Sequence, residues 1–216
     1  MKLNYGIIGT GMMGCEHIRN LKKIPDVKIV AIADPNERSR KWAEDTCEDT
    51  FKLRLYEDYK ELLAQEDIDV VVIASPNFTH IEVMRELFKT DKHVLLEKPM
   101  CTNLSDGIEV LEKSKKHKGV VWIGLEYRFM SPVQSLINHV NEIGNIKMLS
   151  IREHRFPFLE KVDNWNRFNE KTGGTLVEKC CHFFDLMNLM MPSKPIKIYA
   201  SGGQDVNHLD ERYDGK

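Results

Sequence analysis

The sequence predicts a doubly wound parallel α/β sheet over residues 1–124, followed by an incomplete α/β domain over residues 125–216. In the first part, near-continuous apolar runs alternate with amphipathic segments, as in parallel sheets covered by helices on both faces. A glycine-rich turn joins the first apolar run to the first amphipathic segment. The second part offers only two candidate strands, and an isolated strand pair is marginally stable.

The expected elements follow from these patterns. The first part has strands at Gly6–Ile8, Val27–Ala33, Val70–Ala74, Val94–Glu97 and Val120–Ile123. Its helices are Met12–Lys23, Asn36–Cys47, Asp58–Gln65, Thr79–Lys89 and Leu104–His117. The second part has helices Pro132–Glu142 and Thr175–Met190, strands Ile146–Phe156 and Ile196–Ala200, and a loop Phe158–Thr172.

Composition excludes several classes of protein. The 216 residues are 42% hydrophobic and 30% charged, and 31 basic and 33 acidic residues leave a formal charge of −2. This balance argues against nucleic-acid and membrane partners. No apolar run approaches the roughly 20 residues that span a bilayer, and the N-terminus shows no signal-peptide pattern. We therefore expect a cytoplasmic protein.

The five cysteines, Cys15, Cys47, Cys101, Cys180 and Cys181, are odd in number. The adjacent pair does not have the spacing of a zinc site. Free thiols are expected, and no metal site is predicted.

The turn Gly9-Thr10-Gly11-Met12-Met13-Gly14 has the spacing of a dinucleotide-binding turn. The first glycine permits a tight turn, the second lets backbone approach a pyrophosphate, and the third allows close helix–strand packing. The phosphates would meet the free N–H groups of the following helix. Its place between a strand and a helix favours this interpretation over an ordinary turn.

Asp34 ends the second strand, twenty residues after Gly14. An acid at this distance accepts both ribose hydroxyls of an adenosine, although it could also simply begin the turn Asp34-Pro35-Asn36. Because an acid repels a 2′-phosphate, NAD is favoured over NADP. Arg38 lies close enough to keep NADP as the alternative.

The third strand ends in Ser75-Pro76-Asn77-Phe78-Thr79-His80, at the edge where ligands of open sheets bind. We expect Ser75, Pro76 and Asn77 to border the cofactor, with Asn77 near the nicotinamide ribose. Asn77 and His80 could each instead be a helix cap or a helix-start surface residue, and for His80 the sequence leaves this open against lining the pocket.

Glu97-Lys98-Pro99 closes the apolar run Val94–Leu96 at the same edge. Glu97 and Lys98 should therefore also border the cofactor. A lysine partly removed from water has a lowered pKa, which suits proton transfer near neutral pH.

Glu178, His182 and Asp185 are spaced i, i+4 and i+7 and should share one face of the helix beginning at Thr175. A carboxylate on either side could fix the tautomer of His182 or raise its pKa. The many apolar neighbours favour a buried, functional position over a solvated face.

Together these motifs resemble the Gfo/Idh/MocA oxidoreductases from Lys2 to about Gly203. Further landmarks are Tyr127-Arg128-Phe129, Gly144-Asn145-Ile146, and Gly173-Gly174 leading to His182-Phe183-Phe184-Asp185. The resemblance implies a nicotinamide-binding Rossmann domain and a second α/β domain whose open sheet supports homo-oligomers.

By this resemblance, hydride passes between NAD(P) and a carbinol of a sugar, cyclitol or related polyol. Lys98 and His182 would be the proton-handling pair, Glu178 would orient the substrate or His182, and Asp185 would lie behind His182. Arg128 and Trp165 would also contact the substrate.

Two departures separate this chain from the family pattern. Glu178 stands where Asp is common, and Cys180 where glycine is often found; the longer side chain shifts the carboxylate by roughly 1 Å, which matters for catalysis. Family members also continue for many more residues. The alternative functions are therefore an NAD(H)-binding regulatory protein, or an inactive truncated homologue.

Overall fold

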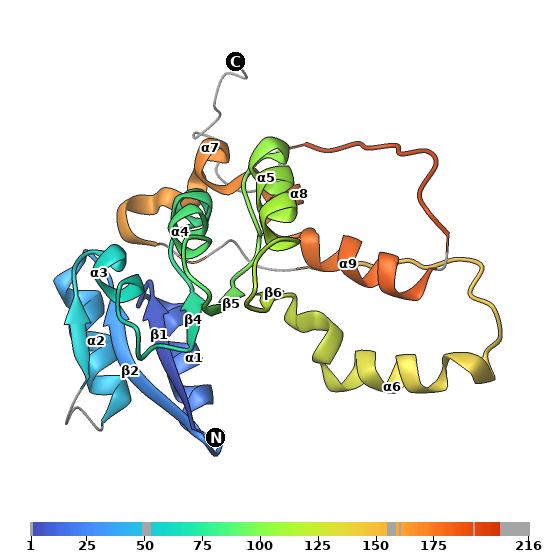
Figure 1. The fold of residues 1–216 in the computed structure, drawn as a ribbon. Coiled ribbons are helices and arrows are strands. Elements are labelled where there is room, and N and C mark those ends of the chain that lie inside the picture. Colours follow the sequence, from blue (N-terminus) through green and yellow to red (C-terminus); the bar gives the residue numbers. More distant parts are fainter. Residues whose placement is uncertain (1, 49–52, 155–158, 160, 192, 204–216) are drawn as a thin grey trace.

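The computed structural model describes residues 2–48, 53–154, 159, 161–191 and 193–203. Six parallel strands form one sheet in the order β3-β2-β1-β4-β5-β6 (Figure 1). The strands are β1 (Leu3–Ile8), β2 (Val27–Ala33), β3 (Arg54–Tyr56), β4 (Val70–Ile73), β5 (His93–Leu96) and β6 (Val121–Ile123). Helices α1 (Met12–Leu21), α2 (Glu37–Cys47), α3 (Tyr59–Leu63), α4 (His80–Leu87) and α5 (Leu104–Ser114) connect them. The predicted Rossmann sheet is confirmed.

The central strand β4 is buried throughout, and its side chains alternate between two cores. Ile73 packs with residues of α4 and α5, including Met84 and Val110. Val72 packs on the other face with residues of α1 and α2, including Ile18. Burial on both faces explains why this strand is a continuous apolar run in the sequence.

One strand, β3, was missing from the sequence prediction. It pairs with β2 at the edge of the sheet, is three residues long, and leaves Leu55 42% exposed. A short edge strand needs no apolar run, because one side of it faces water. No periodicity signal could have found it.

The order in which strands are added to the sheet reverses at β1. After β2 and β3 have been added on one side of β1, β4 to β6 are added on the other side. Ligands of open α/β sheets bind at the carboxyl ends of the strands beside such a switch point. The glycine turn, Asp34, residues 75–80 and the pair Glu97 and Lys98 follow carboxyl ends at this edge.

Beyond β6 the chain is mainly helical. The 3-10 turn η2 (Glu126–Phe129) leads to α6 (Ser131–His139) and η3 (Val140–Glu142). After residues 143–154, which contain neither helix nor strand, come η4 (Val162–Arg167), α7 (Asn169–Thr172), α8 (Thr175–Glu178) and α9 (Cys181–Met190). Helices α6 and α9 extend away from the sheet (Figure 1).

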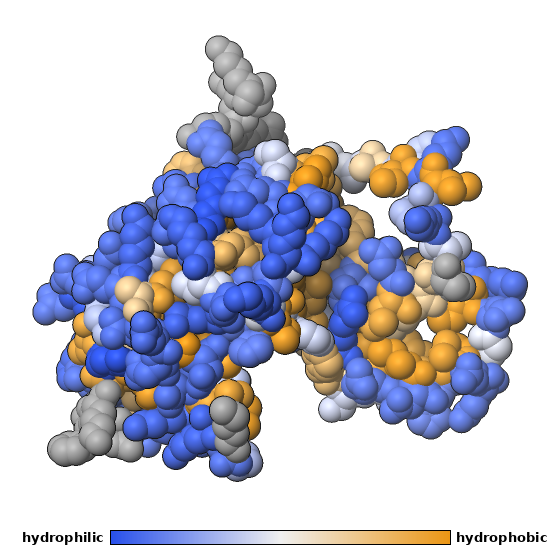
Figure 2. All heavy atoms as spheres, in the orientation of Figure 1, coloured by the Kyte–Doolittle hydropathy of each residue, from blue (hydrophilic) through white to orange (hydrophobic). Residues whose placement is uncertain are grey.

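An apolar hollow of about 330 Å³ separates α6 from α9. Its lining includes Val133 and Leu136 from α6, and Phe183, Leu186 and Met190 from α9. Figure 2 shows apolar atoms open to view in this region. This part of the chain thus leaves apolar surface uncovered.

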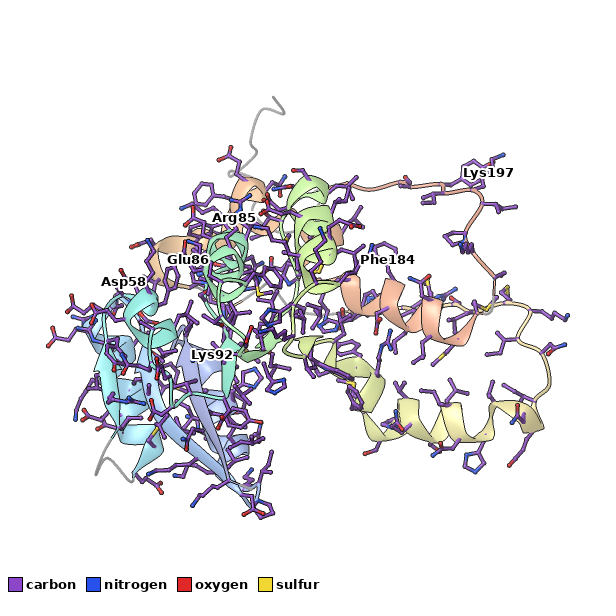
Figure 3. The ribbon with its side chains drawn as sticks, in the orientation of Figure 1. Asp58, Arg85, Glu86, Lys92, Phe184 and Lys197 are labelled. Atoms are coloured by element: carbon purple, nitrogen blue, oxygen red, sulfur yellow. The ribbon has the colours of Figure 1, made fainter. Side chains whose placement is uncertain are left out.

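The two strands predicted in this second part are wrong for the residues described. Residues 146–154 and 196–200 form no strand, and residues 155 and 156 of the first prediction lie outside the described residues. Ile196 and Tyr199 are 99% and 82% exposed, and Lys197 lies on this extended segment, far from the sheet (Figure 3). A strand forms only against a partner, and the described chain places none beside these segments.

Two other predictions for this part need correction. The predicted loop Phe158–Thr172 contains the turns of η4 and α7, while Phe158 itself lies outside the described residues. The predicted helix Thr175–Met190 is divided at Lys179 and Cys180, between α8 and α9. Within the described residues, no helix has the length and apolar character needed to cross a membrane.

Replacing Ile73 by alanine tests the importance of the central core. Ile73 is completely buried, so Ile73→Ala should lower the free energy of unfolding by about 2–5 kcal/mol through lost burial and a residual cavity. Leu104→Ala is the matched control: Leu104 is 79% exposed, and a change of at most about 0.5 kcal/mol is expected. Urea unfolding measures both, and equal losses would contradict the described core.

Candidate active site

The glycine turn lies between β1 and α1 and has one open side. A Cβ at Gly9 would lie 2.4 Å from the Ser75 nitrogen, and one at Gly14 would lie 2.1 Å from the Gly9 oxygen. A Cβ at Gly11 would meet nothing within 4 Å. The backbone of the turn is thus packed tightly at Gly9 and Gly14. At Gly11 it faces open space, next to the free N–H groups at the start of α1. This shape fits the pyrophosphate of a dinucleotide.

Thr10, Met12 and Met13 complete this turn. Thr10 is fully buried, and its Oγ1 has no hydrogen-bond partner among the described residues. Met12 and Met13 begin α1 and are 43% and 38% exposed. Their backbone N–H groups, rather than their side chains, are the groups available to a phosphate.

Asp34 is tied to the glycine turn. One carboxylate oxygen accepts the Thr10 N–H at 2.8 Å, and the other accepts the Asn36 N–H at 2.8 Å. Each carboxylate oxygen has a further lone pair, so the group can still accept ribose hydroxyls. Arg40, which sequence reasoning did not single out, donates to the Asp34 carbonyl at 2.7 Å and to Glu57 at 2.8 Å. Asp34 therefore lies at the end of β2, bonded to the glycine turn.

The segment after β4 lies at the same edge. Asn77 is 7% exposed, and its Nδ2 has no hydrogen-bond partner among the described residues. Ser75 and Pro76 are partly exposed, and the Ser75 hydroxyl lies 2.7 Å from that of Thr79. A buried amide without a partner is costly, which is consistent with a ligand bound here.

His80 is completely buried and does not face the crevice. Its Nδ1 lies 2.9 Å from the Pro99 oxygen, and its Nε2 lies 3.1 Å from the Ser75 oxygen. Burial lowers the pKa of this imidazole, although the bonds to the two carbonyls act in the opposite direction. His80 thus joins the turn after β4 to the turn after β5. It begins α4, as one alternative expected, but it is buried and not a surface residue.

Lys98 follows β5 and reaches the second part of the chain. Its Nζ donates to the Glu178 carbonyl oxygen at 3.3 Å. Its neighbour Glu97 is 7% exposed and lies 2.8 Å from the Nε2 of His17. The Lys98–Pro99 peptide bond is cis.

His182 is almost fully buried, and the charge of Lys98 acts on it. It is 1% exposed and stacks on the Tyr127 ring, with centroids 4.1 Å apart and planes 8° apart. Burial, with the charges of Lys98 and Lys179, lowers the pKa of His182 to about 4. The imidazole is therefore neutral at pH 7, the form that accepts a proton.

The predicted face of Glu178, His182 and Asp185 is interrupted between Glu178 and His182, while His182 and Asp185 both lie on α9. Glu178 lies on α8, before the break, and Asp185 forms two hydrogen bonds with the Arg128 guanidinium. The Arg128 guanidinium is thereby held against α9. The i, i+4, i+7 argument assumed a continuous helix, so it holds only for His182 and Asp185 on α9.

Glu126 is the carboxylate that faces His182, and sequence reasoning missed it. Its Oε1 lies 3.6 Å from the His182 Nε2, and its side chain is 56% exposed. Burial raises the pKa of Glu126, and the nearby Glu97 charge adds to this. The available signal was its place just after β6, at the carboxyl edge of the sheet.

Two residues of the 161–172 region border the site. The Trp165 ring lies edge-on to Phe78 after β4, with centroids 6.3 Å apart. Lys161, also missed from the sequence, is partly buried, and burial lowers its pKa; the charges of Glu178 and Lys98 also act on it. No group of side chains suited to hold a metal ion occurs among the described residues.

The fold and the glycine turn are those of an NAD-binding Rossmann domain. Residues 3–125 match an oxidoreductase family, NAD-binding Rossmann fold, and residues 136–214 match the C-terminal alpha/beta domain of an oxidoreductase family. The chain belongs to the Gfo/Idh/MocA family of oxidoreductases.

Individual relatives agree with this assignment. The chain is 31% identical to the uncharacterized oxidoreductase YrbE of Bacillus subtilis over 94% of its length and 58% of the relative. It is 30% identical to myo-inositol 2-dehydrogenase of Thermotoga maritima, over 93% of this chain and 58% of the relative. The crystal structure of myo-inositol dehydrogenase from Lactobacillus casei, in complex with NAD(H) and myo-inositol, has 27% identity and a TM-score of 0.60, covering 67% of this chain and 43% of that one. This chain thus spans little more than half the length of the curated relatives.

Alanine substitutions in the glycine turn should separate folding from cofactor binding. Gly11→Ala places a methyl group in open space, so thermal stability should hardly change while the Kd for NADH rises about tenfold or more. Gly14→Ala forces backbone apart and should lower both stability and binding. Fluorescence titration and thermal unfolding measure these effects. Unchanged NADH binding in Gly11→Ala would contradict the phosphate site.

The lowered pKa of His182 predicts how the stability of the protein depends on pH. It is lowered in the folded state from 6.5 to about 4, so between these values the unfolded chain binds more protons. Stability should therefore fall as the pH falls from 6.5 towards 4. In His182→Asn this fall should be smaller. Unfolding free energies measured at several pH values test the difference, and NMR titration of the imidazole should give a midpoint near 4.

Proposed function

We propose that this chain is the nucleotide-binding and site-bearing part of an NAD-dependent dehydrogenase that acts on a CH–OH group of a sugar, cyclitol or related polyol. One observation carries this proposal. Lys98, at the carboxyl edge of the sheet, bonds the Glu178 carbonyl oxygen, and its charge acts on His182. The relatives named as inositol dehydrogenases support the substrate class. In this proposal, residues 1–124 bind the nucleotide and residues 125–216 supply His182 and the substrate-facing side chains.

The proposed cofactor is NAD rather than NADP. The turn from Gly9 to Gly14 would hold the pyrophosphate, Asp34 the adenosine ribose, and Asn77 the nicotinamide side. The Asp34 carboxylate would repel a 2′-phosphate, and Arg40 is held by carbonyl oxygens and Glu57. Bound NAD would supply the hydride acceptor, and the remaining chemistry belongs to this chain's side chains.

Oxidation of a carbinol requires that the hydroxyl lose its proton as hydride leaves carbon. We assign proton acceptance to His182, since its neutral imidazole has a free lone pair. Lys98 would donate a hydrogen bond to the same oxygen and stabilise its developing negative charge. Glu126, 3.6 Å from the His182 Nε2, would stabilise the imidazolium formed.

The roles of the other predicted residues follow from their positions. The Glu178 carbonyl orients the Lys98 ammonium. Trp165, beside Phe78, would form one wall of the substrate site. For Arg128 we propose support of α9 through Asp185, in place of the substrate contact expected from the sequence.

Replacing Lys98 tests this function. Lys98→Met keeps most of the side-chain volume, so the Kd for NADH should change less than about threefold, while kcat on a polyol panel should fall by about 10²–10⁴-fold. Lys118→Met is the control, because Lys118 is an exposed lysine paired with Asp91. NADH formation at 340 nm measures turnover, and wild-type kcat in Lys98→Met would overturn the assignment.

A second candidate function is NAD(H) binding without turnover. The exposed side chains of Ile196, Ile198 and Tyr199 favour it, because the described part of the chain leaves this apolar surface uncovered. NADH binding with no turnover on any polyol would support this function. Turnover by the 216-residue chain would exclude it.

A further inference from the structure

Glu97 is a buried carboxylate with two different hydrogen bonds. Its Oε1 lies 2.8 Å from the His17 Nε2, and its Oε2 accepts the Lys98 backbone N–H at 3.2 Å. The Glu97 N–H donates to Ile73 on β4, so the backbone here is held by the sheet. Both oxygens are thus used, and the side chain has a single orientation.

His17 belongs to the helix that carries the phosphate-binding turn. It lies in α1, three residues after Gly14, and its side chain is 20% exposed. A carboxylate only accepts hydrogen bonds, so the His17 Nε2 must carry the proton that it shares with Glu97. The bond therefore connects α1 directly to the residue before Lys98.

The negative charge of Glu97 interacts with Lys98 and His182, the two residues assigned to proton transfer. Burial alone would raise its pKa, but the bond and charge of His17, with the Lys98 N–H and ammonium, lower it below its ordinary value. The same charge acts on His182 and Glu126. An unpaired buried carboxylate would instead take up a proton or turn towards water.

We propose that His17 is a positioning residue of the active site: by holding Glu97 in its buried orientation, it fixes the Lys98 backbone and supplies the negative charge beside Lys98 and His182. The inference rests on the proposed function, since Lys98 and His182 are the groups positioned. It adds to that function a residue that contacts neither substrate nor reacting atoms. Through α1, it also connects the phosphate-binding end of the site to the proton-transfer end.

The test uses the full chain with three variants. His17→Ala removes the partner of Glu97, and His17→Gln keeps an N–H donor that can reach the carboxylate. Glu16→Gln is the control, since Glu16 is an exposed neighbour on α1 that pairs with Arg19. The readouts are amide hydrogen exchange at Lys98, the Kd for NADH, and kcat and KM for the best polyol.

In His17→Ala, exchange of the Lys98 amide should become about tenfold faster, as loss of one hydrogen bond to a charged group predicts. kcat should fall about 10- to 100-fold with KM changed less than about threefold. His17→Gln should recover part of both effects, and Glu16→Gln should match the wild type. Recovery by the glutamine distinguishes positioning from general damage to α1.

Two results would overturn the inference. One is unchanged Lys98 exchange in His17→Ala, which would show that the bond does not order the turn. The other is faster exchange with wild-type kcat, which would show that this order is not needed for the reaction. If the wild-type chain lacks turnover, the dehydrogenase proposal fails separately, and Lys98 exchange alone then decides whether His17 positions Lys98.

Discussion

The parallel pairing of β1 with β2 and β4 is the constraint on which the site depends. Because these strands run in one direction, the segments that leave them meet at one edge. The fit between neighbours is tight there: a Cβ at Gly9 would collide with backbone at Ser75. The turn between β1 and α1 can therefore be built only with glycine at this position. Asp34, Asn77 and Lys98 are brought to that turn by the sheet itself.

The second part of the chain is held to this edge by polar and ring contacts of η2. Tyr127 stacks on His182, and Arg128 bonds Asp185 on the next turn of α9. Lys179 is 7% exposed and bonds the Tyr127 hydroxyl. Buried contacts of this kind lose more when one partner is removed than exposed ion pairs do. They hold His182 where the Lys98 charge acts on it, although no described strand follows β6.

Much of the nucleotide-binding fold could be predicted because its signals are local. β4 is buried on both faces and is therefore an apolar run. The spacing of the glycines indicates the backbone conformation of the turn between β1 and α1. The edge strand β3 gave no such signal. The segment 196–200 has the composition of a strand but no partner, and composition cannot report whether a partner is present.

For the site, the sequence alone determined which residue types stand at the carboxyl ends of strands: the glycine turn, Asp34, Asn77 and Lys98. It could do so because strand ends and glycine spacings are properties of short segments. Only the tertiary structure decided that Glu126 faces His182, that Arg128 is bound to Asp185, and that His17 holds Glu97. These pairs join residues distant in sequence, and their contacts depend on a helix break and a strand order that no local pattern records.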